Sequence, residues 1–489
     1  MKRFARFCFM IVLAALVVFG PALSTFAQGG GAINCNGLSE EDCQIIQDSM
    51  VAMRGISSFS VPTWEFELQI EAGEERMEFA GNGTAMLMLP PEVVAMLSDL
   101  PAAADPFDMG PALAILERLD AEFVQAALAG TLLQIAVNDL TLDAPDQSQS
   151  FNAEFILKDN GVYLHVPSPT GVDQWFGQKI EWTNADLNEL EQGLEEMQAA
   201  LQDPEFAEAM ENMEAMSASL EGLYGVINQY VVTTRGENQT VNGQDMAVFT
   251  TTFDLAGLLA SPELPGAIIT FLNDPAMSEA FAGTDVSTVT ETQVQFVLMT
   301  AGLVLEESSF TMEQWIGLDD LFIHKSQGSM ALTVDVGSLA GESAEPQSFA
   351  ISGSFNIELD QFNAVTPDAV TIPENYLALE DTSNFMVGTP DMIRQALTIG
   401  EPVTASFTTD ENQHVYSVNL PADSAVEVLL ESEGYPYMKV YDPDGFLVEE
   451  YDAYFDDSLI FTAEEDGLYL VVVNSYWEEE YTLTVQLRE

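Results

Sequence analysis

Basic residues are scarce in this chain of 489 residues, where 13 lysines and arginines stand against 79 aspartates and glutamates. The formal net charge of −66 repels nucleic acids and anionic lipid surfaces unless a local basic patch reverses the field. The sequence contains no such basic cluster, so we expect no nucleic-acid partner. The acidic surface by itself indicates high solubility, while a saline habitat and the binding of divalent cations are the alternatives.

Residues and motifs that mark catalytic centres are also sparse. The three histidines, His165, His324 and His414, lie far apart in segments that have the pattern of strands. The sequence has no HExxH, CxxC, GxSxG, Walker or glycine-rich dinucleotide-binding motif. Pairs of acids carry little information in a chain with 79 of them. We therefore expect a protein that is not an enzyme and has no cofactor, with a secreted hydrolase of unrecognised type as an alternative.

Long apolar runs are absent except near the N-terminus. Three basic residues within the first six positions precede the apolar stretch 8–18, and small residues follow at 24–27. This layout predicts a secretory signal peptide that is cleaved near Ala27. The apolar stretch is short for a span of about 20 residues, and Gly20 and Pro21 interrupt it, so we expect no transmembrane anchor. The sequence predicts a secreted or extracytoplasmic protein of the cell envelope.

Cysteine is the next scarce residue. One of the three cysteines lies in the predicted signal peptide, which leaves Cys35 and Cys43. An exported compartment permits a disulfide between them, and it would close a small N-terminal loop. A lipobox requires small and leucine-like residues directly before the cysteine, whereas Ile33 and Asn34 precede Cys35. We therefore expect a chain that carries no lipid on this cysteine.

The remaining sequence alternates between strand and helix patterns. Residues 64–70 place large apolar side chains at every second position, which is typical of a half-buried strand. Asn160-Gly161 and Asn242-Gly243 are strong hairpin signals. Further strands are predicted at 133–137, 151–157, 162–166, 230–234, 246–252, 288–305, 309–316, 321–324, 330–336 and 349–359, and helices at 39–53, 90–130, 184–224 and 254–272. Hairpin-length turns favour an antiparallel sheet with helices on one face.

The C-terminal segment has a purely β pattern with ordered motifs. The matching segments are 414–420 (HVYSVNL), 425–430 (AVEVLL), 438–445 (MKVYDPDG), 459–469 (LIFTAEEDGLY) and 480–485 (EYTLTV). In this order they resemble the bacterial pre-peptidase C-terminal (PPC-like) β-sandwich. The resemblance implies an accessory, non-catalytic module of an exported protein. The chain departs from the family beside Trp477, where three glutamates replace the more usual glycine-rich turn.

A second set of motifs lies in the larger preceding region. The segments are 161–164 (GVYL) followed by Trp175, 240–245 (TVNGQD), 314–325 (QWIGLDDLFIHK) and 357–363 (IELDQFN) with the exit Ile372-Pro373. Their order resembles the lipoprotein-localisation (LolA/LppX-like) fold. The resemblance implies an open, strongly curved antiparallel sheet with helices in its concave face. It also implies a space between sheet and helices that takes lipid or other apolar ligands.

The fold class expected from these patterns is α+β. We predict a large curved antiparallel β-sheet with helices on its concave face, followed by a separate all-β sandwich of jelly-roll or immunoglobulin-like type. The expected boundaries are 1–27 for the signal peptide, 28–44 for an N-terminal lead with the disulfide loop, 45–376 for the LolA/LppX-like region, 377–400 for a linker with a short helix, and 401–489 for the PPC-like sandwich.

The predicted helices that face the sheet are rich in methionine, whose flexible thioether adapts to irregular apolar shapes. Together with the resemblance, this predicts an apolar ligand site. Its candidate residues are Trp64, Phe66, Leu133, Ile135, Met197, Phe206, Met210 and Met213. Methionine at helical spacing more often belongs to an ordinary core, so a filled core remains the alternative.

Two functions of different classes follow from these sequence patterns. The first is an exported, non-enzymatic binding or carrier protein for lipid or another apolar ligand. The second is an envelope or extracellular interaction protein with a filled core, whose sandwich attaches to a partner protein or glycan. No metal is favoured, because acidic turns are far commoner than calcium sites. Asp442 and Asp444, in the turn of the sandwich motif, are the calcium candidates.

Overall fold

The structure is a computed structural model of the chain. It describes residues 35–488 apart from 74, 100–113, 117, 145–146, 202–205, 207–219, 221, 274–288, 306–307, 336–347, 409–411, 433, 435, 453–457 and 476. The predicted signal peptide, Met210 and Met213 therefore lie outside the described residues.

The chain divides into two compact units that both draw on distant parts of the sequence. The first unit contains Met1–Gln134, Lys158–Asn160 and Glu181–Val370, and the second contains Ile135–Leu157, Gly161–Ile180 and Thr371–Glu489. Among the described residues, the largest sheet has 13 strands, and two further sheets have five and four strands. The structure is thus α+β with a large open antiparallel sheet and separate smaller sheets, which confirms the expected fold class at this level.

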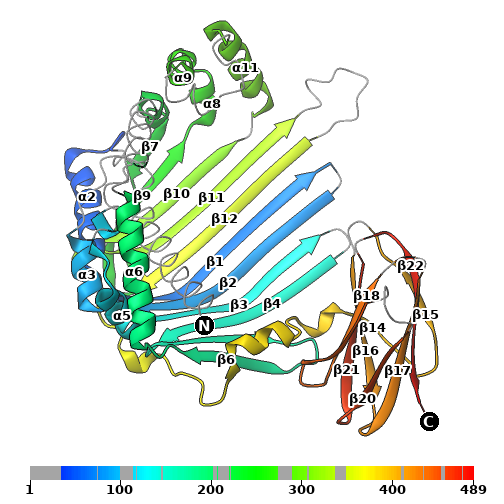
Figure 1. Cartoon of the computed structure of the whole chain (residues 1–489). Coiled ribbons are helices and arrows are strands. Elements are labelled where there is room, and N and C mark those ends of the chain that lie inside the picture. Colours follow the sequence, from blue (N-terminus) through cyan, green and yellow to red (C-terminus); the bar gives the residue numbers. More distant parts are fainter. Residues whose placement is uncertain are drawn as a thin grey trace, which may run out of the picture. The chain divides into compact units, whose positions relative to one another are not determined.

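The strands of the first unit form an antiparallel series (Figure 1). Their order is β2-β1-β12-β11-β10-β9-β7, and β8 pairs with β9. The bounds are β1 Ser58–Ala72, β2 Glu75–Met88, β7 Val231–Arg235, β8 Gln239–Val241, β9 Gln244–Phe253, β10 Ser309–Gly317, β11 Ile323–Asp335 and β12 Ser348–Asp360. The predicted hairpin at Asn242-Gly243 is confirmed, because both residues have positive φ, 51° and 84°, between β8 and β9.

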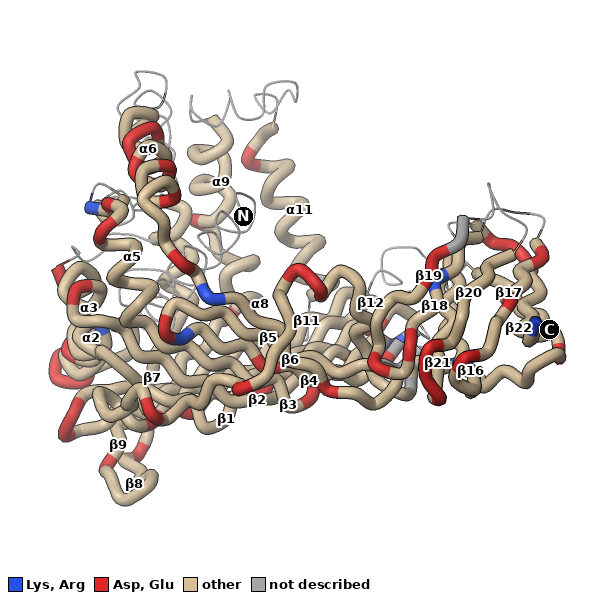
Figure 2. The backbone as a smooth tube through the Cα atoms, turned by 60° about the horizontal axis from the view of Figure 1, so that its bottom comes forward, with Lys and Arg blue, Asp and Glu red and all other residues tan. Residues whose placement is uncertain are grey.

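Helices flank these strands in the described part of the first unit. They are α2 Glu40–Arg54, α3 Pro91–Ser98, α5 Ala121–Gly130, α6 Asn184–Leu201, α8 Leu255–Leu259, α9 Leu264–Leu272 and α11 Glu291–Val304. In Figure 1, α2, α3, α5 and α6 gather at one end of the strands, while α8, α9 and α11 form a second group. In Figure 2, α5, α6, α9 and α11 project from the same side of the sheet.

The strand predicted at 288–305 is wrong, because this segment forms the helix α11. The helix begins with a capping box, in which the Thr290 side chain accepts from the Gln293 backbone N–H and the Gln293 side chain accepts from the Thr290 N–H. These reciprocal bonds satisfy backbone donors that a helix start leaves open. The apolar run that follows fits helix and strand equally well, so the cap was the deciding signal.

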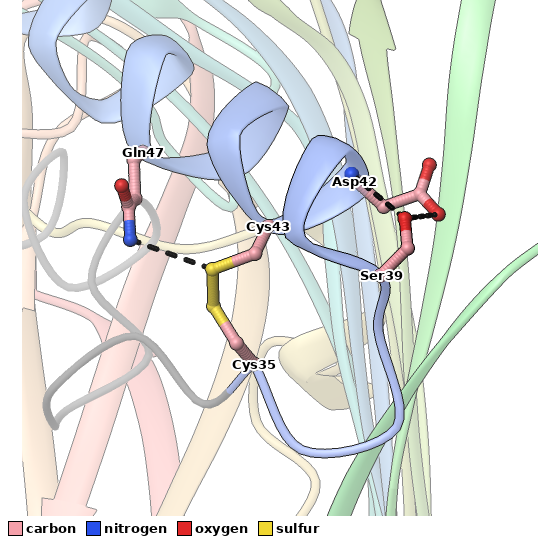
Figure 3. The surroundings of a disulfide bond; sticks show 5 residues. All are labelled: Cys35, Ser39, Asp42, Cys43 and Gln47. Carbon is pink, nitrogen blue, oxygen red and sulfur yellow. Dashed lines mark hydrogen bonds between the residues drawn. A yellow bond between two sulfur atoms is a disulfide. The ribbon is translucent and has the colours of Figure 1, made fainter.

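The N-terminal lead is fastened to the edge of this sheet. Figure 3 shows the Cys35–Cys43 disulfide, which confirms the predicted pair, with the Cα atoms 5.5 Å apart. Asn36, inside the loop, accepts from the Thr233 N–H of edge strand β7 and donates its amide to the Gln229 and Val231 carbonyls. The disulfide loop therefore covers polar backbone groups of an edge strand.

We expect the double variant Cys35→Ser/Cys43→Ser to lose about 2–3 kcal/mol of unfolding free energy, because a short loop is no longer closed in the unfolded chain. Chemical denaturation of the first unit measures the loss. Dithiothreitol should destabilise the wild type by a similar amount and leave the variant unchanged. An equal effect of the reductant on both proteins would contradict this account.

The second unit contains the remaining strands of the large sheet and a two-sheet sandwich. The large-sheet strands run in the order β13-β6-β5-β4-β3. Their bounds are β3 Leu132–Ala144, which begins in the first unit, β4 Gln147–Lys158, β5 Gly161–Pro167, β6 Asp173–Lys179 and β13 Leu377–Ala378. Between β13 and the sandwich, the segment expected to be a linker with a short helix contains two 3₁₀ turns, Leu379–Asn384 and Pro390–Met392.

The sandwich is built from sheets β14-β16-β21-β18-β19 and β15-β22-β17-β20. Their bounds are β14 Ile393–Ala396, β15 Val403–Ser406, β16 Gln413–Leu420, β17 Ser424–Ser432, β18 Tyr437–Tyr441, β19 Leu447–Asp452, β20 Leu459–Ala463, β21 Gly467–Asn474 and β22 Glu480–Leu487. Alternate residues such as Val426, Val428, Val471 and Val473 are fully buried between the sheets. Period-two alternation therefore produces one shared core.

Candidate functional site

The most distinctive surface of the first unit is one face of its sheet. Along β1, Trp64, Phe66, Leu68 and Ile70 point to one face, while acidic and amide side chains at the positions between them point to the other. Side chains alternate between the faces of a strand, and directly paired residues share a face. The strand registers therefore assign each paired residue to one face or the other.

Two cross-strand rows illustrate this apolar face. One row runs Phe79, Leu68, Gly353, Met330 and Phe310 across β2, β1, β12, β11 and β10. The next row runs Gly81, Phe66, Phe355, Gly328 and Met312 across the same strands. We define the apolar face by Trp64, Phe66, Leu68, Ile70, Met77, Phe79, Phe249, Phe253, Phe310, Met312, Met330, Leu332, Val334, Phe349, Ile351, Phe355 and Ile357.

Two glycines leave positions without a side chain on this face. The Phe355 ring lies over Gly328, where a Cβ atom would come within 2.4 Å of a ring carbon. Gly353 lies between Leu68 and Met330, whose side-chain carbons are 3.5 and 3.6 Å from the position of its missing Cβ. The apolar face is therefore uneven, with large side chains beside bare backbone.

Large side chains on this face remain open to solvent. Met77, Phe79, Phe310, Met330 and Phe349 are each between 37 % and 45 % exposed. The face spans about 20 Å along the strands and about 20 Å across them, from strand geometry. An area on the order of 400 Å² equals the largest apolar patch of a typical monomer, and such patches often have a function. The apolar face is therefore our candidate functional site.

The opposite face of the same strands is polar. Lys325 lies 3.7 Å from Glu358 on the neighbouring strand β12. The Gln327 amide and the Thr250 hydroxyl both donate to the Glu313 carboxylate. These contacts are typical of a solvated sheet surface, and they leave the apolar face as the side suited to an apolar partner.

Four of the residues predicted for the ligand site belong to the described part of the first unit. Trp64 and Phe66 share the apolar face, with ring centroids 6.0 Å apart and planes at 9°, and Phe66 also contacts Phe79 at 5.1 Å. Leu133 is buried in the first unit, and Met197 on α6 is half-buried.

The remaining four predicted residues have different settings in the chain. Phe206 is a half-buried helical residue, and Ile135 belongs to the second unit. Met210 and Met213 lie outside the described residues. The assignment of the whole set to one site therefore stays a prediction. Sequence reasoning also missed Phe79, Met330 and their row, because alternation marks a face but not the partner strand.

The three histidines have three different sets of partners. His165 stacks on Trp175 with ring centroids 4.8 Å apart. His324 lies 3.0 Å from an Asp320 carboxylate oxygen. His414 is buried in the sandwich, where it hydrogen-bonds the Tyr481 hydroxyl, which in turn lies 2.6 Å from that of Tyr416. Each histidine thus contacts a different side chain of the protein.

The calcium candidate Asp442 is engaged in its own turn. Its carboxylate accepts from the Phe446 N–H at 2.8 Å, and its carbonyl accepts from the Gly445 N–H at 3.0 Å. Burial raises the pKa of Asp442, and the negative charge of Asp444 adds to the shift. Among the described residues, no group of three or more histidines, cysteines and acids is placed to hold a metal ion. Calcium binding at Asp442 and Asp444 stays a prediction.

We expect Asp442→Asn to stabilise the protein by less than about 1 kcal/mol at pH 7, since the group is half exposed. A raised folded-state pKa means that the charged carboxylate opposes folding, and that this penalty disappears below the unfolded-state pKa of about 3.9. The gain should therefore vanish at pH 3, as measured by thermal unfolding at both pH values. The amide oxygen still accepts from the Phe446 N–H, so a loss of stability at pH 7 would contradict the prediction.

Adding calcium chloride to the same two proteins tests the metal prediction. A calcium-dependent rise in Tm that is present in the wild type and absent from Asp442→Asn would support a site at this turn. An equal response of the two proteins would contradict it.

No helix in the described part of the chain is long and apolar enough to cross a membrane. No protein-family profile and no curated protein matches the sequence.

Solved structures resemble two parts of the chain. Mycobacterium tuberculosis lipoprotein LppX covers 67 % of this chain and 98 % of its own, with 10 % identity and a TM-score of 0.21. The pre-peptidase C-terminal domain of a Bacillus anthracis collagenase covers 19 % and 95 %, with 15 % identity and a TM-score of 0.18. The Aeromonas hydrophila periplasmic inhibitor of g-type lysozyme covers 20 % and 97 %, with 15 % identity and a TM-score of 0.18. The chain is similar in part to LppX and to a pre-peptidase C-terminal domain.

Proposed function

We propose that this protein is an exported, non-enzymatic carrier or binding protein for a lipid or another apolar ligand. The observation that carries the proposal is the continuous apolar face of the first unit, with five large side chains more than a third exposed. The ligand lies against this face, and the helices of the same unit cover it from the concave side of a curved sheet. The mechanism is passive burial of apolar surface.

Physical chemistry supports an acyl chain as the ligand class. Each methylene removed from water contributes about 0.8 kcal/mol, so a long chain gains affinity without polar contacts. Met77, Met312 and Met330 on the face have flexible side chains that adapt to such a ligand. The dimensions of about 20 Å in each direction match an extended chain lying along the strands.

Native mass spectrometry of the purified protein tests this function. We expect adducts whose masses correspond to lipids of the expression host, and uptake of a fluorescent fatty acid after delipidation. A clean apoprotein mass together with no uptake of the fatty acid would contradict the carrier function.

We propose that export proceeds through a signal peptide at 1–27 with cleavage near Ala27, and that the released protein carries no lipid at Cys35. The Cys35–Cys43 disulfide supports this route, because structural disulfides persist in oxidising compartments. N-terminal sequencing of the secreted protein should begin near Gln28. A mature chain that starts with a modified Cys35 would contradict the proposal.

A second candidate function is attachment to a protein or glycan through the sandwich. Trp477 supports it, because this side chain at the departure from the family pattern is 71 % exposed. Exposed tryptophan is enriched at binding hot spots. Loss of surface attachment in Trp477→Ala, with lipid content unchanged, would favour this function over the carrier.

A further inference from the structure

Helices α9 and α11 pack against each other and form a surface that is almost free of charge. The sequence of α9, LPGAIITFL, has no charged residue, and that of α11, ETQVQFVLMTAGLV, has only Glu291 in its first turn. Figure 2 shows this contrast, since α9 and most of α11 are tan while α6 carries many acids. A surface with so few charged residues is unusual in a chain with 79 acidic residues.

The outer side of α11 exposes large apolar side chains. Phe296, Val297 and Met299 are between 57 % and 64 % exposed, whereas Val294 on the same helix is buried. Exposed clusters of large apolar side chains often mark sites of contact with a protein or a membrane. The inward side of α11 is therefore satisfied by the protein, and its outward side is suited to an apolar partner.

Three polar side chains of α9, its C-terminal cap and α11 turn back to their own backbone. Thr270 donates to the Gly266 carbonyl, Asn273 to the Ile269 carbonyl and Thr300 to the Phe296 carbonyl, each at 2.8 or 2.9 Å. Such i−4 bonds satisfy the donors without water, as polar side chains in helices do in apolar surroundings. These three side chains can therefore leave water with little loss of hydrogen bonding.

The net charge of the chain limits which partners can bind the apolar surface of α9 and α11. A second copy of this chain and an anionic bilayer are both repelled by a net charge of −66. An uncharged or zwitterionic lipid surface is not. The 14 residues of α11 extend only about 21 Å, less than the roughly 30 Å of a bilayer core, so the helix lies at the interface instead of spanning it.

We propose that α9 and α11 dock the protein on a zwitterionic lipid surface, with Phe296, Val297 and Met299 inserted among the lipids. This proposal goes beyond the carrier function, because a protein can dock on lipid without holding a ligand. For a carrier, docking brings the first unit to the place where its ligand is found.

Flotation with phosphatidylcholine vesicles tests the proposal on the full mature chain. The wild type should float with the vesicles, and Phe296→Gln/Met299→Gln should lower the bound fraction at least about tenfold, because insertion of apolar side chains drives the binding. Val51→Gln is the matched control, since Val51 on α2 is 68 % exposed but lies outside the α9–α11 surface. Its bound fraction should equal that of the wild type.

The proposal would be overturned if the wild type did not float, or if the double variant floated like the wild type. It would also be overturned if light scattering showed a dimeric wild type and a monomeric double variant, because the surface would then bind a second copy of the chain. Matching circular dichroism spectra of the wild type and the variants would show that the substitutions leave the fold intact. Uptake of a fluorescent fatty acid from solution distinguishes the docking proposal from the carrier proposal. The docking variant should take up the fatty acid like the wild type. If the carrier proposal is wrong, neither protein should take it up.

Discussion

Replacing Phe79 and Met330 together with glutamine weakens the binding of a fluorescent fatty acid at least about tenfold. The two side chains belong to one cross-strand row of the apolar face and are both partly exposed, so the folded protein loses little when they change. A bound acyl chain would cover both amides without offering a hydrogen bond. Leaving a polar group buried and unpaired costs about 1–3 kcal/mol in proteins, which is why two such groups produce a large loss.

The matched control is Ser329→Gln/Ser354→Gln. These serines pair with each other across β11 and β12 and are exposed on the polar face, one residue from Met330 and Phe355 respectively. The control should bind the fatty acid like the wild type in a fluorescence titration, and all three proteins should have similar Tm values. Equal binding by both double variants, or equal loss in both, would show that the ligand does not lie on the apolar face.

Local signals in the sequence predicted local structure well. The predicted helix start at Ser39 is confirmed, because its side chain accepts from the Asp42 N–H at the N-terminus of α2. The alternation of 64–70 placed Trp64 and Phe66 on one face, and the structure stacks them there. Both features depend on residues within a few positions of one another, so the sequence pattern contains all the information that decides them.

The same reasoning could not predict which strands pair when they lie far apart in the sequence. Gly353 lies between Leu68 and Met330 in space but is 285 positions from Leu68 in the chain numbering. Nothing in the alternation of β1 says that β12 is its neighbour, since a shift to another strand would preserve the pattern. The predicted domain boundaries 45–376 and 401–489 stay a prediction, and the second compact unit contains Gly161–Ile180 as well as the sandwich strands.

Phe176 connects parts of the second unit that lie far apart in the sequence. This β6 side chain is fully buried, and its ring lies 5.1 Å from Phe385 and 6.3 Å from Phe446. Gly445, at φ 90°, lets the β18–β19 turn approach, because a Cβ there would lie 2.6 Å from the Ser168 hydroxyl oxygen. The aromatic cluster thus joins β5–β6 and the sandwich strands of the same unit into one packed body.

Phe176→Ala should therefore destabilise the second unit by about 3–5 kcal/mol, the usual cost of removing a buried ring and leaving a cavity. Trp175→Ala is the matched control, since this neighbour faces the other side of β6, is half-buried and stacks on His165. It should cost roughly half as much or less. Denaturant unfolding of the second unit measures both losses. An equal loss in the two variants would contradict the prediction that the buried Phe176 ring stabilises the second unit more than its half-buried neighbour does.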